Sequence, residues 1–109
     1  MNVCKKKKKN AIEHELVAAN EVHPPFASLH EAYAVILEEF DEAEEQMQLC
    51  KEEMGELWRT VKSDHLKGSL ESLHWIQVYA QKSAEECCQL AAMAIKAQQS
   101  EIERMEGSE

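Results

Sequence analysis

The chain has 109 residues, of which 44% are hydrophobic and only 6% aromatic, and its formal net charge is -9. This length suits one domain with one core, and the acidic balance argues against a nucleic-acid partner, because only a short lysine run is basic. No apolar run is long enough to span a bilayer. The N-terminal lysines are not followed by an apolar segment, so we expect no signal peptide and predict a cytoplasmic protein without a membrane partner.

Three glycines and two prolines leave few places for the chain to turn, which favours a small number of long helices. The four cysteines form no CxxC pair, and the histidines are not spaced as metal ligands with them. We therefore expect reduced, mostly structural cysteines, with neither disulfides nor zinc.

The first residues carry five consecutive lysines, and such a block of like charge is normally disordered. We predict a disordered basic tail over residues 1–9 and a single all-α domain over residues 10–109. Asn10 to Glu13 resembles a capping box, which predicts a short helix from about Ala11 to Ala19. Two successive prolines, Pro24 and Pro25, must then follow in an extended segment.

A second capping box, Ser28 to Glu31, predicts the start of a long helix that ends near Lys62. Its apolar positions alternate in steps of four and three for more than four heptads. A helix of this length spans roughly 50 Å and cannot bury its apolar stripe within this chain alone. It requires a second long helix, a second copy, or both. The stripe consists of Leu29, Tyr33, Ile36, Phe40, Ala43, Met47, Cys50, Met54, Leu57 and Val61.

Ser69 is a suitable N-cap for a last helix from Leu70 to about Met105, after a turn that we place at Gly68. Its repeating apolar side begins at Leu73 and becomes rich in alanine towards its end. The predicted fold is all-α: a long antiparallel helical hairpin plus a short N-terminal helix, assembling into a four-helix-bundle-like homo-oligomer, either dimer or tetramer.

The segment 38–56 carries nine acidic residues. Glu39 and Glu42 are three residues apart at the edge of the apolar stripe, so they project side by side, and Glu86 and Gln89 are spaced alike on the last helix. Two such pairs that converge form an oxygen-lined site suited to Mg²⁺. The alternative interpretation is an ordinary surface carboxylate pair, which is common on acidic helices.

Two segments carry a resemblance to a known family. Glu38-Glu39-Phe40-Asp41-Glu42, within the stretch from Ser28 to Glu42, reads as an EExxE signature. Glu86-Cys87-Cys88-Gln89, within Glu85 to Ala94, stands where a second signature, ExxD, is expected. In this order, the two segments resemble the MazG-like nucleoside triphosphate pyrophosphohydrolases, especially the short phage and prophage members.

The resemblance implies an all-α, oligomeric hydrolase that cleaves an NTP or dNTP to the monophosphate and pyrophosphate with Mg²⁺, for which Mn²⁺ can substitute. It implies that Glu39, Glu42 and Glu86 bind the metal with Gln89, and that Glu38 and Glu39 serve catalysis. We also expect Lys96, seven residues after Gln89, and His30, near a helix N-terminus, to contact the nucleotide. For His30, simple exposure to solvent or contact with Phe26 is an equally good interpretation. The implied residues are Glu38, Glu39, Glu42, Glu86, Gln89, Lys96 and His30.

Two departures from the family pattern keep other functions open. Gln89 replaces an acid, which leaves the site one charge short. The gap between Glu42 and Glu86 is also longer than the family usually shows, and with the turn at Gly68 these two acids would be offset by roughly 12 Å along straight helices. A second EExxE, Glu52 to Glu56, is a rival metal site nearer that level. The alternatives are a protein that binds nucleotides without cleaving them and a purely structural helical oligomer of phage origin.

Overall fold

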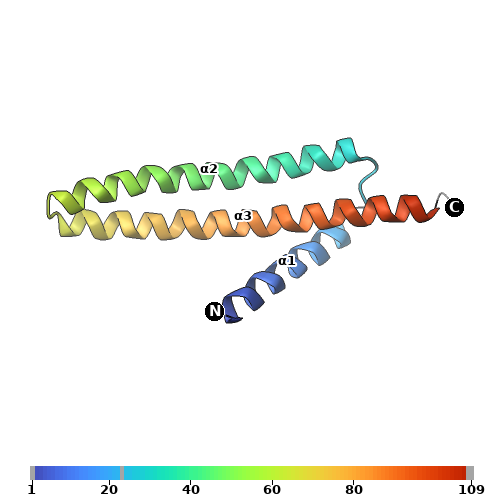
Figure 1. Cartoon of the computed structure of the whole chain (residues 1–109), viewed down its shortest axis with the longest axis horizontal. Coiled ribbons are helices and arrows are strands. Elements are labelled where there is room, and N and C mark those ends of the chain that lie inside the picture. Colours follow the sequence, from blue (N-terminus) through green and yellow to red (C-terminus); the bar gives the residue numbers. More distant parts are fainter. Residues whose placement is uncertain (1, 23, 108–109) are drawn as a thin grey trace. The chain divides into compact units, whose positions relative to one another are not determined.

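The computed structural model describes residues 2–22 and 24–107, with the side chains of residues 2–10 and 22 left undescribed. These residues form three helices, α1 (Asn2–Val22), α2 (Leu29–Lys62) and α3 (Leu66–Gly107), and the described ranges contain no strand (Figure 1). The predicted all-α class is confirmed. Within the same ranges, no helix has both the length and the apolar character that a bilayer crossing requires.

The chain divides into two compact units. Unit 1 comprises residues 1–40 and 87–109, and unit 2 comprises residues 41–86. Unit 2 therefore contains the second part of α2, the turn, and the first part of α3.

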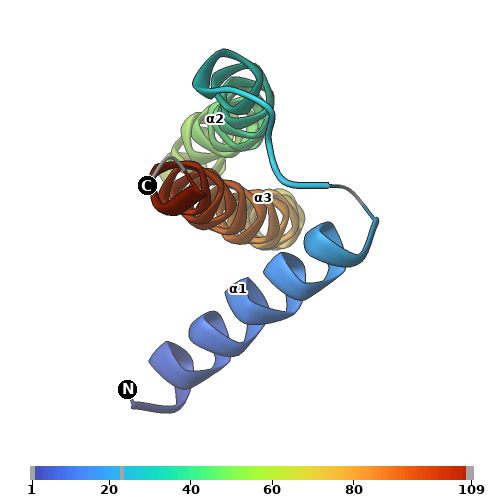
Figure 2. The same ribbon diagram turned by 90° about the vertical axis from the view of Figure 1, so that its right-hand side faces the viewer.

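Helix α1 is longer than predicted at both ends. It begins at Asn2 and so includes the backbone of the lysine run, whereas the capping pattern predicted a start near Ala11. Lysine has a high intrinsic helix propensity, and here it extends the helix that follows. Asn10 consequently lies inside the helix and not at its start. The segment that joins α1 to α2 is non-helical at Pro24 and Pro25, as predicted (Figure 2).

Helix α2 starts where the capping box predicted. The backbone N–H of Glu31 donates to Ser28 Oγ at 3.1 Å, and the Glu31 carboxylate accepts from the N–H of Ala27 at 3.0 Å. The second hydrogen bond reaches one residue further back than in the usual box. The bond from Glu31 satisfies a backbone donor that the first turn of a helix leaves unpaired, and the bond from Ala27 ties the residue before the N-cap to that turn.

Unit 1 has a small core around Phe26, which packs with Ala32 and Ala97. The N–H of Phe26 donates to Ser100 Oγ at 3.1 Å, and its carbonyl oxygen accepts from Arg104 Nη1 at 2.6 Å. These bonds satisfy both backbone groups of a residue that lies in a non-helical segment and is buried. They fix that segment to α3.

The turn between α2 and α3 centres on Asp64, whose φ of 53° is in the left-handed region. The N–H of His65 donates to the carbonyl of Thr60 at 2.9 Å, and the N–H of Asp64 donates to that of Val61 at 3.2 Å. This pair of bonds is a Schellman motif with aspartate in the position that glycine usually occupies. The His65 ring then accepts from the N–H of Gly68 at Nδ1 (2.8 Å), so His65 caps α3.

Helix α3 therefore begins at Leu66, earlier than the predicted Leu70, and the placement of the turn at Gly68 was wrong. Ser69 is inside the helix, and its hydroxyl donates to Thr60 Oγ1 at 2.9 Å instead of capping. The His65 imidazole accepts the third N–H of the helix and so caps α3 about one turn before the predicted cap at Ser69.

Within unit 2, side chains of one helix bond to the backbone of the other. Ser83 Oγ donates to the carbonyl of Ala43 at 3.3 Å, and Cys50 Sγ donates to that of Ile76 at 4.0 Å. The predicted stripe is split along α2: Ala43 and Cys50 are buried, whereas Met47 and other large members are exposed. On α3 the predicted core position Cys87 is exposed, as are Leu73, Ala80 and Ala84.

Candidate metal centre

Glu42 and Glu86 of unit 2 lie at the same level on either side of the turn. Glu42 is 22 residues before Asp64 and Glu86 is 22 residues after it. The predicted offset of roughly 12 Å was therefore wrong, because it followed from placing the turn at Gly68 instead of Asp64. The left-handed turn residue thus decides which two acids face each other.

The carboxylates of Glu42 and Glu86 each offer an oxygen within 4.8 Å of the other. Glu42 is exposed and Glu86 is half-buried. A side-chain hydrogen bond with Glu86 raises the pKa of Glu42, and the charges of Glu86 and Glu45 together with partial desolvation raise it further. Two like charges at this separation favour a proton or a cation between them.

Glu39 lies one turn before Glu42 in α2 and is half-buried. Helix geometry places residues three apart on one side, and an oxygen of Glu39 lies within 4.8 Å of one of Glu42. Glu38 is exposed and points away from Glu39 by about 100° around the helix. The predicted acids Glu39, Glu42 and Glu86 are thus the ones that the described residues assemble, whereas Glu38 is outside their group.

The other predicted site residues lie further along the same helices. Gln89 follows Glu86 by one turn in α3 and is half-buried. Lys96 lies about 15 Å along α3 from Glu86 by helix rise, with Nζ 4.8 Å from the centre of the Phe26 ring. His30 is exposed in the first turn of α2, about 13 Å along that helix from Glu39.

The rival EExxE segment has a different environment. Glu56 is paired with Arg59 one turn later, and this hydrogen bond lowers the pKa of Glu56. Glu56 and Arg59 also line a cavity of about 500 Å³, together with Glu53 and Trp75. Across the described ranges, this segment contributes to no group of three metal-ligating side chains, so the geometry favours the first EExxE.

Carboxylate oxygens at this spacing are the ligands that Mg²⁺ and Ca²⁺ prefer, and the absence of sulfur or imidazole from the group disfavours zinc. The local chemistry therefore suits a hard divalent cation. Comparison with protein-family models, with curated proteins and with solved structures finds no match to this chain.

Proposed function

We propose that the chain is a Mg²⁺-dependent nucleotide pyrophosphohydrolase-like protein that cleaves an NTP or dNTP to the monophosphate and pyrophosphate. The observation that carries the proposal is the approach of Glu42 and Glu86, with Glu39 one helical turn away. The order of the two signature segments, which resembles that of MazG-like enzymes, supplies the reaction class. As part of the same proposal, we place the protein in the cytoplasm, where nucleoside triphosphates are abundant.

In this proposal, Glu39, Glu42 and Glu86 hold the metal, and the amide oxygen of Gln89 serves as a weaker ligand. The raised pKa of Glu42, which is caused first by the hydrogen bond with Glu86 and then by the charge of that acid, supports the assignment, because a cation between the carboxylates would take the place of the shared proton and relieve the repulsion. When bound, Mg²⁺ neutralises phosphate charge and makes a coordinated water more acidic.

The chain's own contribution is to orient the reactants. Glu39 is the half-buried acid of the EExxE segment, and it would accept a proton from the attacking water while Glu38 orients that water from the exposed side. Lys96 and His30 are more than two helical turns from the three acids, so their proposed role is to contact remote parts of the nucleotide.

The finer architecture belongs to the same proposal. We infer a long antiparallel hairpin of α2 and α3 that pairs with other copies into a four-helix bundle, as a dimer or tetramer. The contacts of Ser83 with Ala43 and of Cys50 with Ile76 in unit 2 support the hairpin.

A second candidate function is nucleotide binding without cleavage. Gln89 favours it, because a neutral amide reduces the negative charge that holds the metal. In that case, calorimetry would detect nucleotide binding in the presence of Mg²⁺ while no pyrophosphate is released.

The test is pyrophosphate release from a panel of NTPs and dNTPs with Mg²⁺. We expect release by the natural chain, and its loss in Glu42→Gln and in Glu86→Gln. The matched control is Glu44→Gln, which removes an exposed acid of the same helix outside the group. A second control, Glu56→Gln, removes an acid of the rival segment and should leave release unchanged.

Diffraction from crystals soaked in Mn²⁺ would locate the ion independently of turnover. Anomalous density between Glu42 and Glu86 would support the proposed metal site, whereas density at Glu56 would show that the metal binds to the rival EExxE segment. A folded protein that neither binds Mn²⁺ nor releases pyrophosphate from any nucleotide would reject both candidate functions and leave a structural helical protein.

A further inference from the structure

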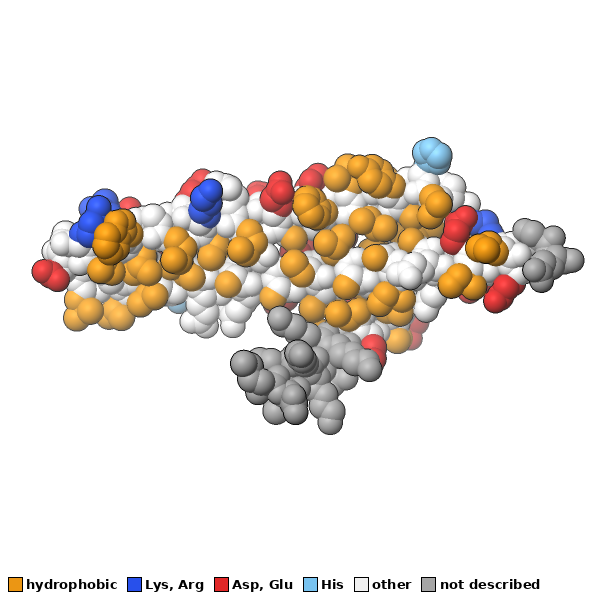
Figure 3. Space-filling view, viewed as in Figure 1, with side chains coloured by type: hydrophobic (Ala, Val, Ile, Leu, Met, Phe, Trp, Pro, Cys, Tyr) orange, Lys and Arg blue, Asp and Glu red, His pale blue; other side chains and the backbone are white. Residues whose placement is uncertain are grey.

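A cavity of about 500 Å³ lies within unit 2, beside the turn between α2 and α3. Cavities that bind small organic ligands commonly have a volume of this order. Hydrophobic side chains gather over both helices of unit 2 on the face drawn in Figure 3, whereas most residues that line the cavity are polar. None of the described residues that line it belongs to the group formed by Glu39, Glu42 and Glu86. The cavity is therefore a separate candidate site.

Both helices contribute one side of themselves to the cavity wall. The lining residues follow one another in steps of three and four along each helix, and residues at such steps share one helix face. The wall is thus built by regular helix geometry on both sides. The residues with this spacing include Glu53, Glu56 and Thr60 of α2 and Gly68, Ser72 and Trp75 of α3.

The charge of the lining favours a cationic ligand. Arg59 is the one Lys or Arg among the described lining residues, and its Nε and Nη2 both donate to the carboxylate of Glu56. Glu53 and Glu71 also line the cavity, and over the described ranges neither acid has an ion pair or a hydrogen bond. The lining therefore carries two uncompensated negative charges, which attract a cation and repel an anion.

A single metal ion does not fit these acids. In the part of the chain that the structure describes, Glu53, Glu56 and Glu71 do not form a group of three ligating oxygens within 4.8 Å of one another. Glu53 is 11 residues before Asp64 and Glu71 is 7 residues after it. By helix rise, the two unpaired acids therefore differ in level by about 6 Å. A longer cation with two charged groups can reach both.

Trp75 supplies an aromatic ring at the level of Glu53, because it is as many residues after the turn as Glu53 is before it. Its ring is stacked on that of Tyr79, with 5.8 Å between the centroids and 27° between the planes, and it stays 41% exposed. Ammonium groups bind to the faces of such rings. The chain already has one example, in which Lys62 Nζ lies 5.3 Å from the centre of the Trp58 ring.

Ser72 is an independent observation that points to a ligand. It lines the cavity and is only 2% exposed, yet the hydrogen bonds of the described residues include none from or to its hydroxyl. Serines inside helices often donate to the carbonyl four residues earlier, as Ser63 and Ser100 do. Among the described residues that are not exposed, every fully buried side-chain oxygen has a partner. The small exposed part of Ser72 therefore includes its hydroxyl, which a ligand in the cavity can reach.

We propose that this cavity binds an aliphatic diamine, with one ammonium group between Glu53 and the Trp75 ring and the other at Glu71 and Ser72. The ammonium N–H groups donate to the carboxylates and to the hydroxyl, and the aliphatic chain contacts the indole. The site goes beyond the proposed hydrolase, because it uses neither the metal-binding acids nor a nucleotide.

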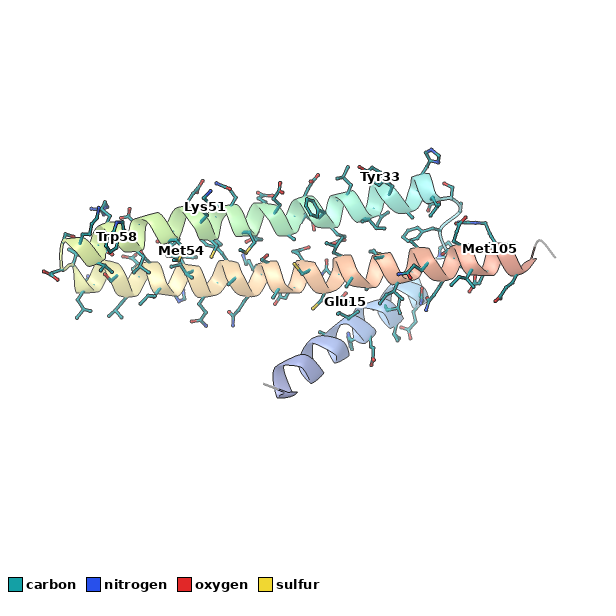
Figure 4. The ribbon with its side chains drawn as sticks, in the orientation of Figure 1. Glu15, Tyr33, Lys51, Met54, Trp58 and Met105 are labelled. Carbon is teal, nitrogen blue, oxygen red and sulfur yellow. The ribbon has the colours of Figure 1, made fainter. Side chains whose placement is uncertain are left out.

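The test is calorimetric titration of the full chain with putrescine at low salt, without divalent cations. We expect one site per chain, whose affinity falls as salt is added. Glu53→Gln and Trp75→Leu should each raise the Kd about fivefold, through loss of an ion pair and of a cation–π contact. The matched controls are Glu52→Gln and Trp58→Leu, which change the same residue types outside the lining and should leave the Kd unchanged (Figure 4).

The chemical class is tested with other probes. Ethylamine, which has one ammonium group, should bind more weakly than putrescine, and Glu71→Gln should weaken putrescine without affecting ethylamine. Tighter binding of inorganic phosphate than of putrescine would overturn the cationic class. If acetyl-lysine amide, a stand-in for a protein side chain, binds as tightly as putrescine, the second ammonium contact is wrong.

Two outcomes would overturn the site itself. One is the absence of putrescine binding at millimolar concentration. The other is equal weakening by Glu53→Gln and Glu52→Gln, which would show attraction to the acidic chain as a whole. If Trp75→Leu does not fold by circular dichroism, Trp58→Phe leaves Trp75 as the single tryptophan of the chain, and putrescine should change its fluorescence. Unchanged emission at saturating putrescine would contradict the contact with the indole.

Discussion

Two glycines that lie inside helices, Gly55 and Gly68, allow a sharp test of the turn that sets Glu42 level with Glu86. Alanine is about 1 kcal/mol more favourable than glycine inside a helix. At Gly55 an added Cβ would meet nothing within 4 Å, so Gly55→Ala should stabilise the protein by about that amount.

Gly68 has the opposite environment. An added Cβ would lie 2.6 Å from His65 Nδ1 and 2.9 Å from Thr60 Cγ2. To relieve the overlap, the His65 ring and the Thr60 side chain must move. The cap that His65 forms and the hydrogen bond from Ser69 to Thr60 each stabilise the protein by about 1 kcal/mol, and both are weakened. After the propensity gain, Gly68→Ala should destabilise the protein by about 1 kcal/mol.

The two alanine variants should thus differ by about 2 kcal/mol, or about 10 °C in melting temperature for a chain of this size. Thermal and urea unfolding followed by circular dichroism would measure the difference. A double-mutant cycle with His65→Ala supplies the control, because Gly68→Ala should cost less once the ring is absent. Equal stabilisation by both substitutions would show that His65 and Thr60 do not lie close to Gly68, and would therefore refute the turn centred on Asp64.

Glu42→Gln should raise the melting temperature at pH 8 in the absence of divalent cations, and the gain should vanish towards pH 4. The raised pKa of Glu42 means that the folded state favours the protonated acid, so the natural protein loses stability as the pH rises through that pKa and Glu42 ionises. A gain in melting temperature that is larger at pH 4 than at pH 8 would contradict this pH dependence. Asp64→Gly should stabilise the chain by about 0.5–1 kcal/mol, since glycine adopts a positive φ without steric cost; loss of stability in urea unfolding would show that the Asp64 side chain contributes a contact. Ser100→Ala should cost about 1–2 kcal/mol, because it leaves the buried N–H of Phe26 without its acceptor; Gln99→Ala, at the neighbouring exposed position, is the control.

The periodicity of the sequence was sufficient to predict α2 almost to the residue. Ser28 and Glu31 have the chemistry of a capping box, and the bonds that they form are local, so no distant part of the chain was needed to place them. The pairing of Glu39 with Glu42 was equally predictable, because residues three apart on one helix must project together.

The start of α3 was not predictable in this way. Ser69 and Gly68 each have a strong local preference, for an N-cap and for a turn, and both are overridden by contacts with Thr60 and His65 across the turn. A shift of the turn by a few residues has a large effect, because each residue lengthens one helix and shortens the other and so changes the offset between facing positions by about 3 Å.

The amino-acid sequence by itself determined that the chain is helical, where its longest regular stripe runs, and which acids share a helix face. Only the tertiary structure decided that Glu86 faces Glu42, because that depends on where the chain reverses. It also decided that the apolar stripe is divided, with Ala43 and Cys50 inside and Met47 and Met54 exposed. A periodic pattern shows that a helix has an apolar side, but which half of that side a neighbouring helix covers depends on the fit of side chains that are remote in sequence.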